Sequence, residues 1–208
     1  MTSSSQPHMP EAALARLIQA YEQAEIILEY GSGGSTELAA AMPGKFIMSV
    51  ESDAEWARAL RQKLGQAHPP SRTIIHHVDI GPTGDWGRPI DTTLWRDYHR
   101  YPNDIWERPF FRHPDVILID GRFRTACLAT AMLRTRRPLV ILFDDYVNRP
   151  KYHLVEQAIK PVAFHDRMAE FHVQPDQVRT QDMGLLIQQF FQVSLHGVNA
   201  QAYRLPDN

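Results

Sequence analysis

The fold is decided by residues 26–37, which read IILEYGSGGSTE. The apolar run 26–28 ends at Glu29, a glycine-rich turn follows at 31–34, and residues 35–42 have the Ala, Leu and Glu content of a helix. A strand, a glycine loop and a helix in this order present backbone N–H groups and a helix N-terminus to a ligand. Glycine suits the turn because it has no Cβ and adopts positive φ at little cost. The stretch therefore predicts a ligand site at the first strand of an α/β sheet.

The rest of the chain repeats this alternation of strands and helices. Strands are predicted at 45–50, 73–78, 115–119 and 139–143, and helices at 10–23, 52–64, 124–133 and 150–159. Two strands without an intervening helix are predicted in the tail, at 168–173 and 185–193. Near-continuous apolar strands that alternate with helices indicate a doubly wound, mostly parallel sheet, with the late pair forming an antiparallel edge.

Composition limits the function classes. The 208 residues suit one domain over 10–208, after a polar lead at 1–9, and a net charge of −2 argues against nucleic-acid binding. The one cysteine excludes an internal disulfide. Neither a secretory pattern nor an apolar run of about 20 residues is present, so a soluble, cytoplasmic protein without a membrane partner is expected. A homo-oligomer remains compatible with this composition.

Residues 81–114 form an irregular insertion rich in aromatic side chains. It carries three of the four tryptophans, namely Trp86, Trp95 and Trp106. A loop of this length in a compact domain is usually functional or disordered, and its aromatic content argues against disorder. Two interpretations stay open, a lid or acceptor platform over the ligand site and a packed cover or dimer contact.

The glycine pattern restricts the ligand. A dinucleotide fingerprint requires G-x-G-x-x-G; Gly31 and Gly33 match its first two positions, but Thr36 occupies the third. No Lys-Ser/Thr pair of a phosphate-binding loop follows. Glu51 lies 22 positions after Glu29, where an acid would bind ribose hydroxyls. The pattern predicts an adenosine-like ligand whose phosphates are not required, with a nicotinamide-dependent oxidoreductase as one alternative.

Together these features resemble the class I S-adenosylmethionine-dependent methyltransferases. The resemblance rests on E-x-G-x-G at Glu29, Gly31 and Gly33, on an acid ending the second strand and on Asp79 ending the third, and it spans about residues 10–193. It implies a seven-stranded sheet in the order 3-2-1-4-5-7-6, with the last strand antiparallel. It also implies S-adenosylmethionine as the cofactor, and these roles: Glu29, Gly31 and Gly33 at the methionine portion, Glu51 at the ribose, Asp79 and Ile80 at the adenine, and Asp120 with Gly121 near the sulfonium.

Asp120, Asp144 and Asp145 follow the fourth and fifth strands. Adjacent strand ends bring such carboxylates together, and hard divalent cations prefer oxygen ligands. The arrangement is similar to that of the cation-dependent O-methyltransferases, but Asp-Asp stands where Asp-Asn is common. The preferred interpretation has no metal: Asp144 or Asp145 caps the next helix and Asp120 touches the cofactor. Asp120 and Asp144 are the candidate catalytic groups.

The methyl acceptor is expected to be a small molecule. Candidate acceptor-binding residues around the same edge are Arg122, Arg124, Tyr146 and Trp86. Guanidinium groups match carboxylates and phosphates, so an anionic or polyhydroxylated acceptor methylated at oxygen is the leading hypothesis. The alternative is a methyltransferase-like protein that binds the cofactor without conventional catalysis.

Overall fold

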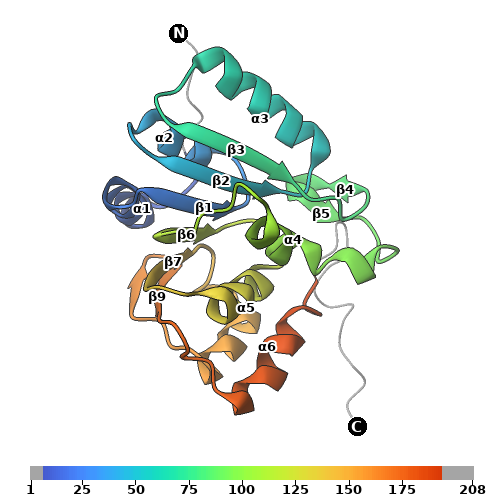
Figure 1. Ribbon diagram of the computed structural model, residues 1–208. Coiled ribbons are helices and arrows are strands. Elements are labelled where there is room, and N and C mark those ends of the chain that lie inside the picture. The colour runs from blue at the N-terminus through green and yellow to red at the C-terminus, as the bar shows by residue number, and fades with distance from the viewer. Residues whose placement is uncertain (1–6, 194–208) are drawn as a thin grey trace.

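The computed structural model describes residues 7–193 and contains a seven-stranded sheet (Figure 1). Its strands, from edge to edge, are β3 (Arg72–His77), β2 (Phe46–Glu51), β1 (Ile26–Tyr30), β6 (Val116–Ile119), β7 (Leu139–Phe143), β9 (Met168–Val173) and β8 (Ala163–His165). The first five pair in parallel, and β9 runs antiparallel to both of its neighbours. Numbered within this sheet, the order is 3-2-1-4-5-7-6 with the last strand antiparallel, so the predicted topology is confirmed.

Successive side chains of each strand point to opposite faces of the sheet, and helices cover both faces. Leu28 and Tyr30 share a buried cluster with side chains of α4 (Arg100–Asn103), α5 (Arg124–Arg134) and α6 (Met183–Gln189). Ile27 packs in a second cluster with α1 (Glu11–Gln23) and α2 (Gly34–Ala41), and α3 (Ala54–Ala67) covers the same face further along. Burial on both faces explains why these strands read as continuous apolar runs.

The predicted strand at 185–193 is wrong. Residues Met183–Gln189 form α6, and the edge strand is β8, three residues that the sequence pattern did not reveal. Within α6, Leu186 is fully buried while the adjacent Ile187 is 53% exposed, and the Gln189 amide donates to the Leu185 carbonyl one turn earlier. A short apolar run fits either a strand or a helix, so periodicity alone could not decide. The predicted helix at 150–159 is a 3-10 helix, η4 (Pro150–Gln157).

The insertion at 81–114 has two structurally different parts. Its first part is a small hairpin of β4 (Thr83–Gly84) and β5 (Arg88–Pro89), joined by the 3-10 turn η1 (Asp85–Gly87). Its later part, through η2 (Trp95–Asp97), α4 and η3 (Asp104–Glu107), buries Tyr98, Tyr101 and Trp106 in the main core. The Trp106 indole donates to the Tyr30 hydroxyl at 2.7 Å, which fastens this part over the end of β1. The insertion is therefore a packed cover with a hairpin whose tip, at Asp85 and Trp86, is exposed.

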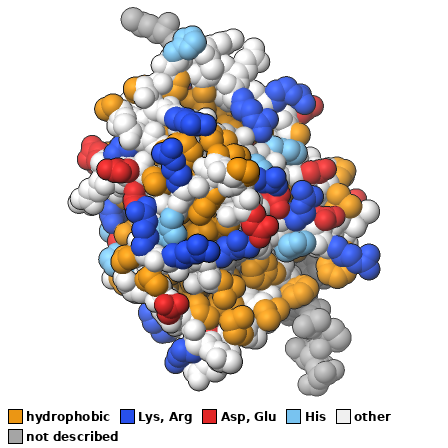
Figure 2. Space-filling model, viewed as in Figure 1, with side chains coloured by type: hydrophobic (Ala, Val, Ile, Leu, Met, Phe, Trp, Pro, Cys, Tyr) orange, Lys and Arg blue, Asp and Glu red, His pale blue; other side chains and the backbone are white. Residues whose placement is uncertain are grey.

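No helix among residues 7–193 is long and apolar enough to cross a membrane. On the face drawn in Figure 2, basic side chains are interspersed with acidic and apolar ones rather than gathered in one patch.

Candidate active site

A cavity of about 580 Å³ opens at the carboxyl ends of β1, β2 and β6. This is the point where the strand order reverses, between β1 and β6, which is where open α/β sheets bind ligands. Its volume is within the usual range for small-molecule sites. The cavity is lined by residues 7–9, 31–35, 51–53, 86–88 and 120–122, together with Trp56, Tyr101, Arg124, Asp145, Arg149 and Arg167.

The two glycines of the E-x-G-x-G pattern have different roles. Gly31 has φ +103°, and a Cβ there would lie 2.7 Å from the backbone nitrogen of Gly121. Gly31 is therefore required because two loops meet backbone to backbone. Gly33 also lines the cavity, but a Cβ on it would meet nothing within 4 Å. The space in front of Gly33 is thus open to a ligand that approaches the start of α2.

Glu29 holds the glycine loop from behind. It is fully buried, and its carboxylate accepts hydrogen bonds from the Tyr21 hydroxyl at 2.6 Å and the Thr36 hydroxyl at 2.5 Å. The same Thr36 oxygen accepts from the Gly33 backbone N–H at 3.0 Å. Burial raises the pKa of Glu29, and these hydrogen bonds oppose that rise. Glu29 does not line the cavity, so its predicted contact with the methionine portion is not supported by the geometry.

Glu51 ends β2 and does line the cavity. Its Oε1 accepts from the backbone N–H groups of Ser52 and Asp53 at 2.7 and 2.9 Å. Its Oε2 accepts one longer bond, 3.2 Å, from the Ser32 N–H in the glycine loop. Since a carboxylate oxygen has two lone pairs, Oε2 keeps the capacity to accept from a ligand hydroxyl.

Asp79 and Ile80 do not line the cavity. Asp79 is exposed and accepts from the Gly81 N–H, whereas Ile80 is buried in the core. The hairpin of the insertion lies against the end of β2 instead, where the Ser52 hydroxyl donates to the Gly87 carbonyl at 3.0 Å. The predicted adenine contacts of Asp79 and Ile80 are therefore not supported.

Two exposed tryptophans supply aromatic surface at the cavity instead. Trp86, at the tip of the hairpin, has φ +63° and is 80% exposed. Trp56, from the first turn of α3, is 49% exposed and its indole donates to the Ser32 carbonyl at 2.8 Å. Both line the cavity near Glu51.

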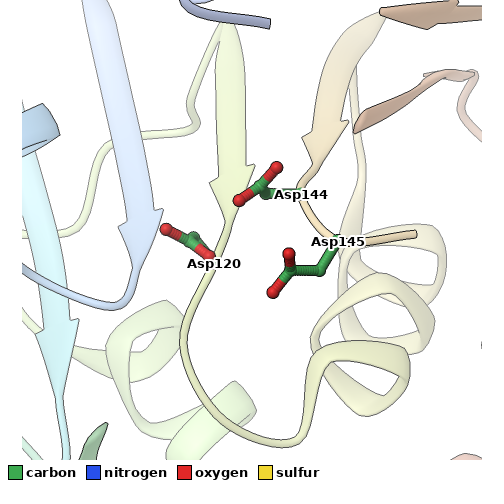
Figure 3. A group of neighbouring side chains, drawn as sticks. All are labelled: Asp120, Asp144 and Asp145. Atoms are coloured by element: carbon green, nitrogen blue, oxygen red, sulfur yellow. The ribbon is translucent and has the colours of Figure 1, made fainter. Parts of the chain in front are cut away.

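The strand-end acids come together as predicted. Asp120, Asp144 and Asp145 surround the ends of β6 and β7 (Figure 3), each with a carboxylate oxygen within 4.8 Å of the others. Asp120 and Asp145 line the cavity, while Asp144 is fully buried behind them. Burial and the charges of Asp144 and Asp145 raise the pKa of Asp120 to about 6, against the opposing effect of Arg124.

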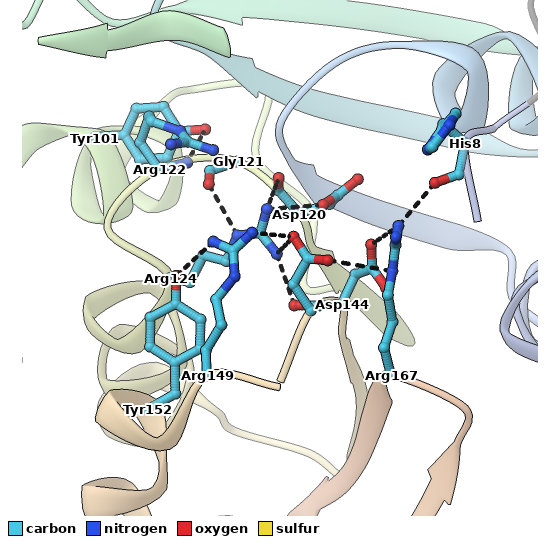
Figure 4. A network of polar contacts seen from close by, with 11 residues as sticks. His8, Tyr101, Asp120, Gly121, Arg122, Arg124, Asp144, Arg149, Tyr152 and Arg167 are labelled. Carbon is cyan, nitrogen blue, oxygen red and sulfur yellow. Dashed lines mark hydrogen bonds and ion pairs between the residues drawn. The ribbon is translucent and has the colours of Figure 1, made fainter. Parts of the chain in front are cut away.

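Three arginines neutralise these three aspartates, and Figure 4 shows Arg124, Arg149 and Arg167 around Asp120 and Asp144. Arg167 binds Asp144 with two nitrogens, at 2.9 and 2.7 Å. Arg149 binds Asp145 at 2.6 Å, and Arg124 binds Asp120 at 2.9 Å. A divalent cation would have to displace these guanidinium groups. The set therefore does not fit a metal centre.

The predicted acceptor-binding residues separate into two groups. Arg122 and Trp86 line the cavity, and within residues 7–193 the Arg122 side chain has no ion pair and its Nε has no hydrogen-bond partner, while Trp86 is 80% exposed. Arg124 also lines it, but only 5% of its side chain is exposed and it donates to the carbonyls of Asp120, Gly121 and Asp144. Arg124 thus ties two loops together.

Tyr146 is fully buried. Its hydroxyl donates to Glu156 at 3.0 Å, and it does not line the cavity, so it is a packing residue.

Sequence patterns did not predict several residues that line the cavity, namely Trp56, Arg88, Tyr101, Arg167 and the short segment at 7–9. Arg167 lies in the turn between β8 and β9, and its Nη2 also donates to the His8 carbonyl at 2.7 Å. No local spacing connects these residues to the glycine loop. Only the knowledge that β9 inserts beside β7 could have indicated Arg167.

Comparison with known proteins identifies similar structures. The chain is 46% identical to a methyltransferase-like protein of Silicibacter pomeroyi, with a TM-score of 0.81 over 89% of this chain and 96% of that one. It also shares its fold with an O-methyltransferase of Bacillus cereus solved with S-adenosylhomocysteine (16% identity, TM-score 0.51, 82% and 81% covered). A third similar structure is an S-adenosylmethionine-dependent O-methyltransferase of Thermotoga maritima, with 12% identity and a TM-score of 0.51 over 83% of this chain and 68% of that one. No family model and no curated protein matches the chain.

Proposed function

Because the chain belongs to the class I S-adenosylmethionine-dependent methyltransferase superfamily, we propose that it binds S-adenosylmethionine and transfers the methyl group to an oxygen atom of a small acceptor. One observation carries this proposal. The cavity at the reversal of strand order is bounded by Gly33, with open space before it, and by Glu51, with a carboxylate oxygen free to accept. These are the features that an adenosine-containing ligand with a methionine end requires.

The cavity residues divide among the parts of the cofactor. Gly33 and the backbone at the start of α2 would hold the methionine portion, and Glu51 would accept from the ribose hydroxyls. Trp56 and Trp86 would offer their ring faces to the adenine, in the place first expected for Asp79 and Ile80. When bound, the cofactor supplies an electrophilic methyl group on a positively charged sulfur.

Asp120 is the group in this cavity best suited to take a proton from a hydroxyl acceptor. It lines the cavity, and a pKa of about 6 leaves it ionised but still basic at neutral pH. Arg124 fixes its position through the 2.9 Å ion pair. Asp144 is buried behind it and holds Arg167, so its role is positioning rather than catalysis. Most of the rate would come from orienting the acceptor toward the methyl group.

The assignment to oxygen rests on Asp120, because the likeness to the O-methyltransferases shows the fold alone. A hydroxyl must lose its proton during transfer, and a carboxylate with a raised pKa is a suitable base. Arg122 in the same cavity favours an acceptor that also carries an anionic group or several hydroxyls.

The test is transfer of labelled methyl from S-adenosylmethionine to a panel of small hydroxylated and carboxylated acids. We expect transfer to at least one of them, equal with and without EDTA, and at least 100-fold slower in Asp120→Asn, since general-base catalysis contributes about 10²–10⁴. Transfer that requires a divalent cation would contradict the arginine-neutralised site. Binding of S-adenosylhomocysteine without transfer to any acceptor would favour the binding-only alternative.

A further inference from the structure

The arginines of the cavity differ in whether they form ion pairs. Five guanidinium groups line it, from Arg88, Arg122, Arg124, Arg149 and Arg167. The last three are paired with the acidic group of Asp120, Asp144 and Asp145 described above. Within residues 7–193, Arg88 and Arg122 have no ion pair. Two cationic side chains of this part of the chain thus line the cavity without a direct ion pair, although the carboxylates of Glu51 and Asp53 line the same cavity.

Arg122 is the more unusual of the two. Its Nε is buried and has no hydrogen-bond partner in the described part of the chain. Figure 4 shows its side chain beside Tyr101, apart from the paired arginines, and its backbone N–H donates to the Tyr101 hydroxyl at 3.4 Å. Burial lowers the pKa of Arg122, which means that the charged form is disfavoured where it stands. A buried N–H without a partner on a partly buried charged group is costly, and an anion with oxygen acceptors would relieve that cost.

Arg88 reaches the same cavity from a different element. It is the first residue of β5, directly after Gly87, whose carbonyl accepts from the Ser52 hydroxyl. That contact fixes the hairpin and with it the start of the Arg88 side chain. The positive charge of Arg88 is itself one reason for the lowered pKa of Arg122, so the two cations act on each other. Like charges held together are typical of a site that an anion completes.

We propose that Arg88 and Arg122 form an anion-binding subsite that holds a carboxylate or phosphate group of the methyl acceptor. The assignment to the acceptor rests on the proposed function, whereas the anion-binding property does not. Two sources offer the same chemistry, an acidic acceptor and the methionine carboxylate of the cofactor. The acceptor is favoured because Arg122 follows Asp120 by two residues, beside the proposed base, and because Arg88 comes from the hairpin of the insertion rather than from the glycine loop.

The experiment measures binding of inorganic phosphate and of benzoate at constant ionic strength, by calorimetry and by thermal shift. It compares the wild type, Arg88→Gln and Arg122→Gln with a control, Arg96→Gln, whose guanidinium lies over the Trp95 ring outside the cavity. We expect one of the two anions to bind the wild type and the control equally, and each cavity variant at least tenfold more weakly. Anion binding that is equal in all four proteins, or absent from the wild type up to 50 mM, would overturn the proposal.

S-Adenosylhomocysteine binding to the same proteins separates the two sources. An unchanged Kd in Arg88→Gln and Arg122→Gln assigns the subsite to the acceptor, as proposed. A tenfold weaker Kd assigns it to the cofactor carboxylate and overturns the acceptor assignment. Failure of the wild type to bind S-adenosylhomocysteine refutes the proposed function, while the phosphate result still decides whether the subsite exists.

Stability provides a check on folding. Arg122→Gln removes an unpaired charge and should leave the unfolding temperature unchanged or higher. Arg124→Gln, which breaks two ion pairs and three hydrogen bonds, should lower it. If Arg122→Gln fails to fold, Arg88→Gln on the hairpin of the insertion still tests the subsite.

Discussion

Replacement of Thr36 by valine tests how the glycine loop is held. Valine keeps the shape of threonine but removes the hydroxyl that donates to Glu29 and accepts from the Gly33 N–H. The lost bond to a buried carboxylate is worth about 1.5–3 kcal/mol and the neutral one about 0.5–1.5 kcal/mol. We therefore expect Thr36→Val to lower the free energy of unfolding by about 2–4 kcal/mol, or about 5–15 °C in Tm for a chain of this size.

Cofactor affinity should fall together with stability, because Gly33 both donates to Thr36 and lines the cavity. A loosened loop should weaken S-adenosylhomocysteine binding about tenfold, equivalent to about 1.4 kcal/mol. The stability deficit should shrink at acidic pH, since protonation of Glu29 removes the charge that Thr36 stabilises.

The matched control is Thr130→Val. Thr130 is equally buried, but its hydroxyl makes one long bond, 3.4 Å, to Asn103, away from the loop. Urea unfolding and calorimetry of both variants provide the measurement. If Thr36→Val matches Thr130→Val in stability and in cofactor affinity, the hydrogen bonds that join Glu29, Thr36 and Gly33 do not hold the glycine loop.

Four further predictions follow from the geometry. Glu170→Gln should lower the free energy of unfolding by about 3 kcal/mol at neutral pH, because Arg16 and two histidines lower the pKa of Glu170 to about 2 from 4.5. This loss should vanish as the pH falls from about 4.5 to 2, as measured by urea unfolding across pH. The control, Glu107→Gln at an exposed ion pair, should cost under about 1 kcal/mol throughout. Gly31→Ala should cost about 2–4 kcal/mol by the same assay, through positive φ and overlap with Gly121. Arg167→Gln should cost about 3–5 kcal/mol, because it leaves the buried Asp144 without its bidentate partner. The pH profile of kcat/KM should rise through about pH 6 as Asp120 ionises, and a profile without this rise would remove Asp120 as the base.

The sheet could be predicted from sequence because its signal is local and repeated. The strands β1, β2, β6 and β7 are buried on both faces, so each reads as an apolar run that ends in an acid or at a turn. The order of the strands came from the resemblance to a family rather than from the pattern itself. The tail failed for a physical reason: α6 is only seven residues long, and a run of that length carries too little periodicity.

The site was harder to predict because acids at strand ends do not all face the same way. Glu29 points to the face covered by α1 and α2, where Tyr21 and Thr36 bind it. Thr36, which breaks the dinucleotide fingerprint, turned out to be the residue that secures the loop. Asp79 does not line the cavity, whereas the hairpin does, and the hairpin meets the end of β2 through Ser52 and Gly87, 35 residues apart, a long-range contact that no spacing rule detects.

The central claim is that the cavity beside Gly33 and Glu51 binds S-adenosylmethionine without a metal. The most direct measurement is calorimetric binding of S-adenosylhomocysteine and of NAD, in EDTA, to the wild type and to Gly33→Val, whose added methyl groups would enter the open space before the loop. We predict that S-adenosylhomocysteine binds the wild type, that NAD does not, and that Gly33→Val weakens binding at least tenfold while its Tm stays within a few degrees. Binding of NAD alone, or S-adenosylhomocysteine binding that Gly33→Val leaves unchanged, would contradict it.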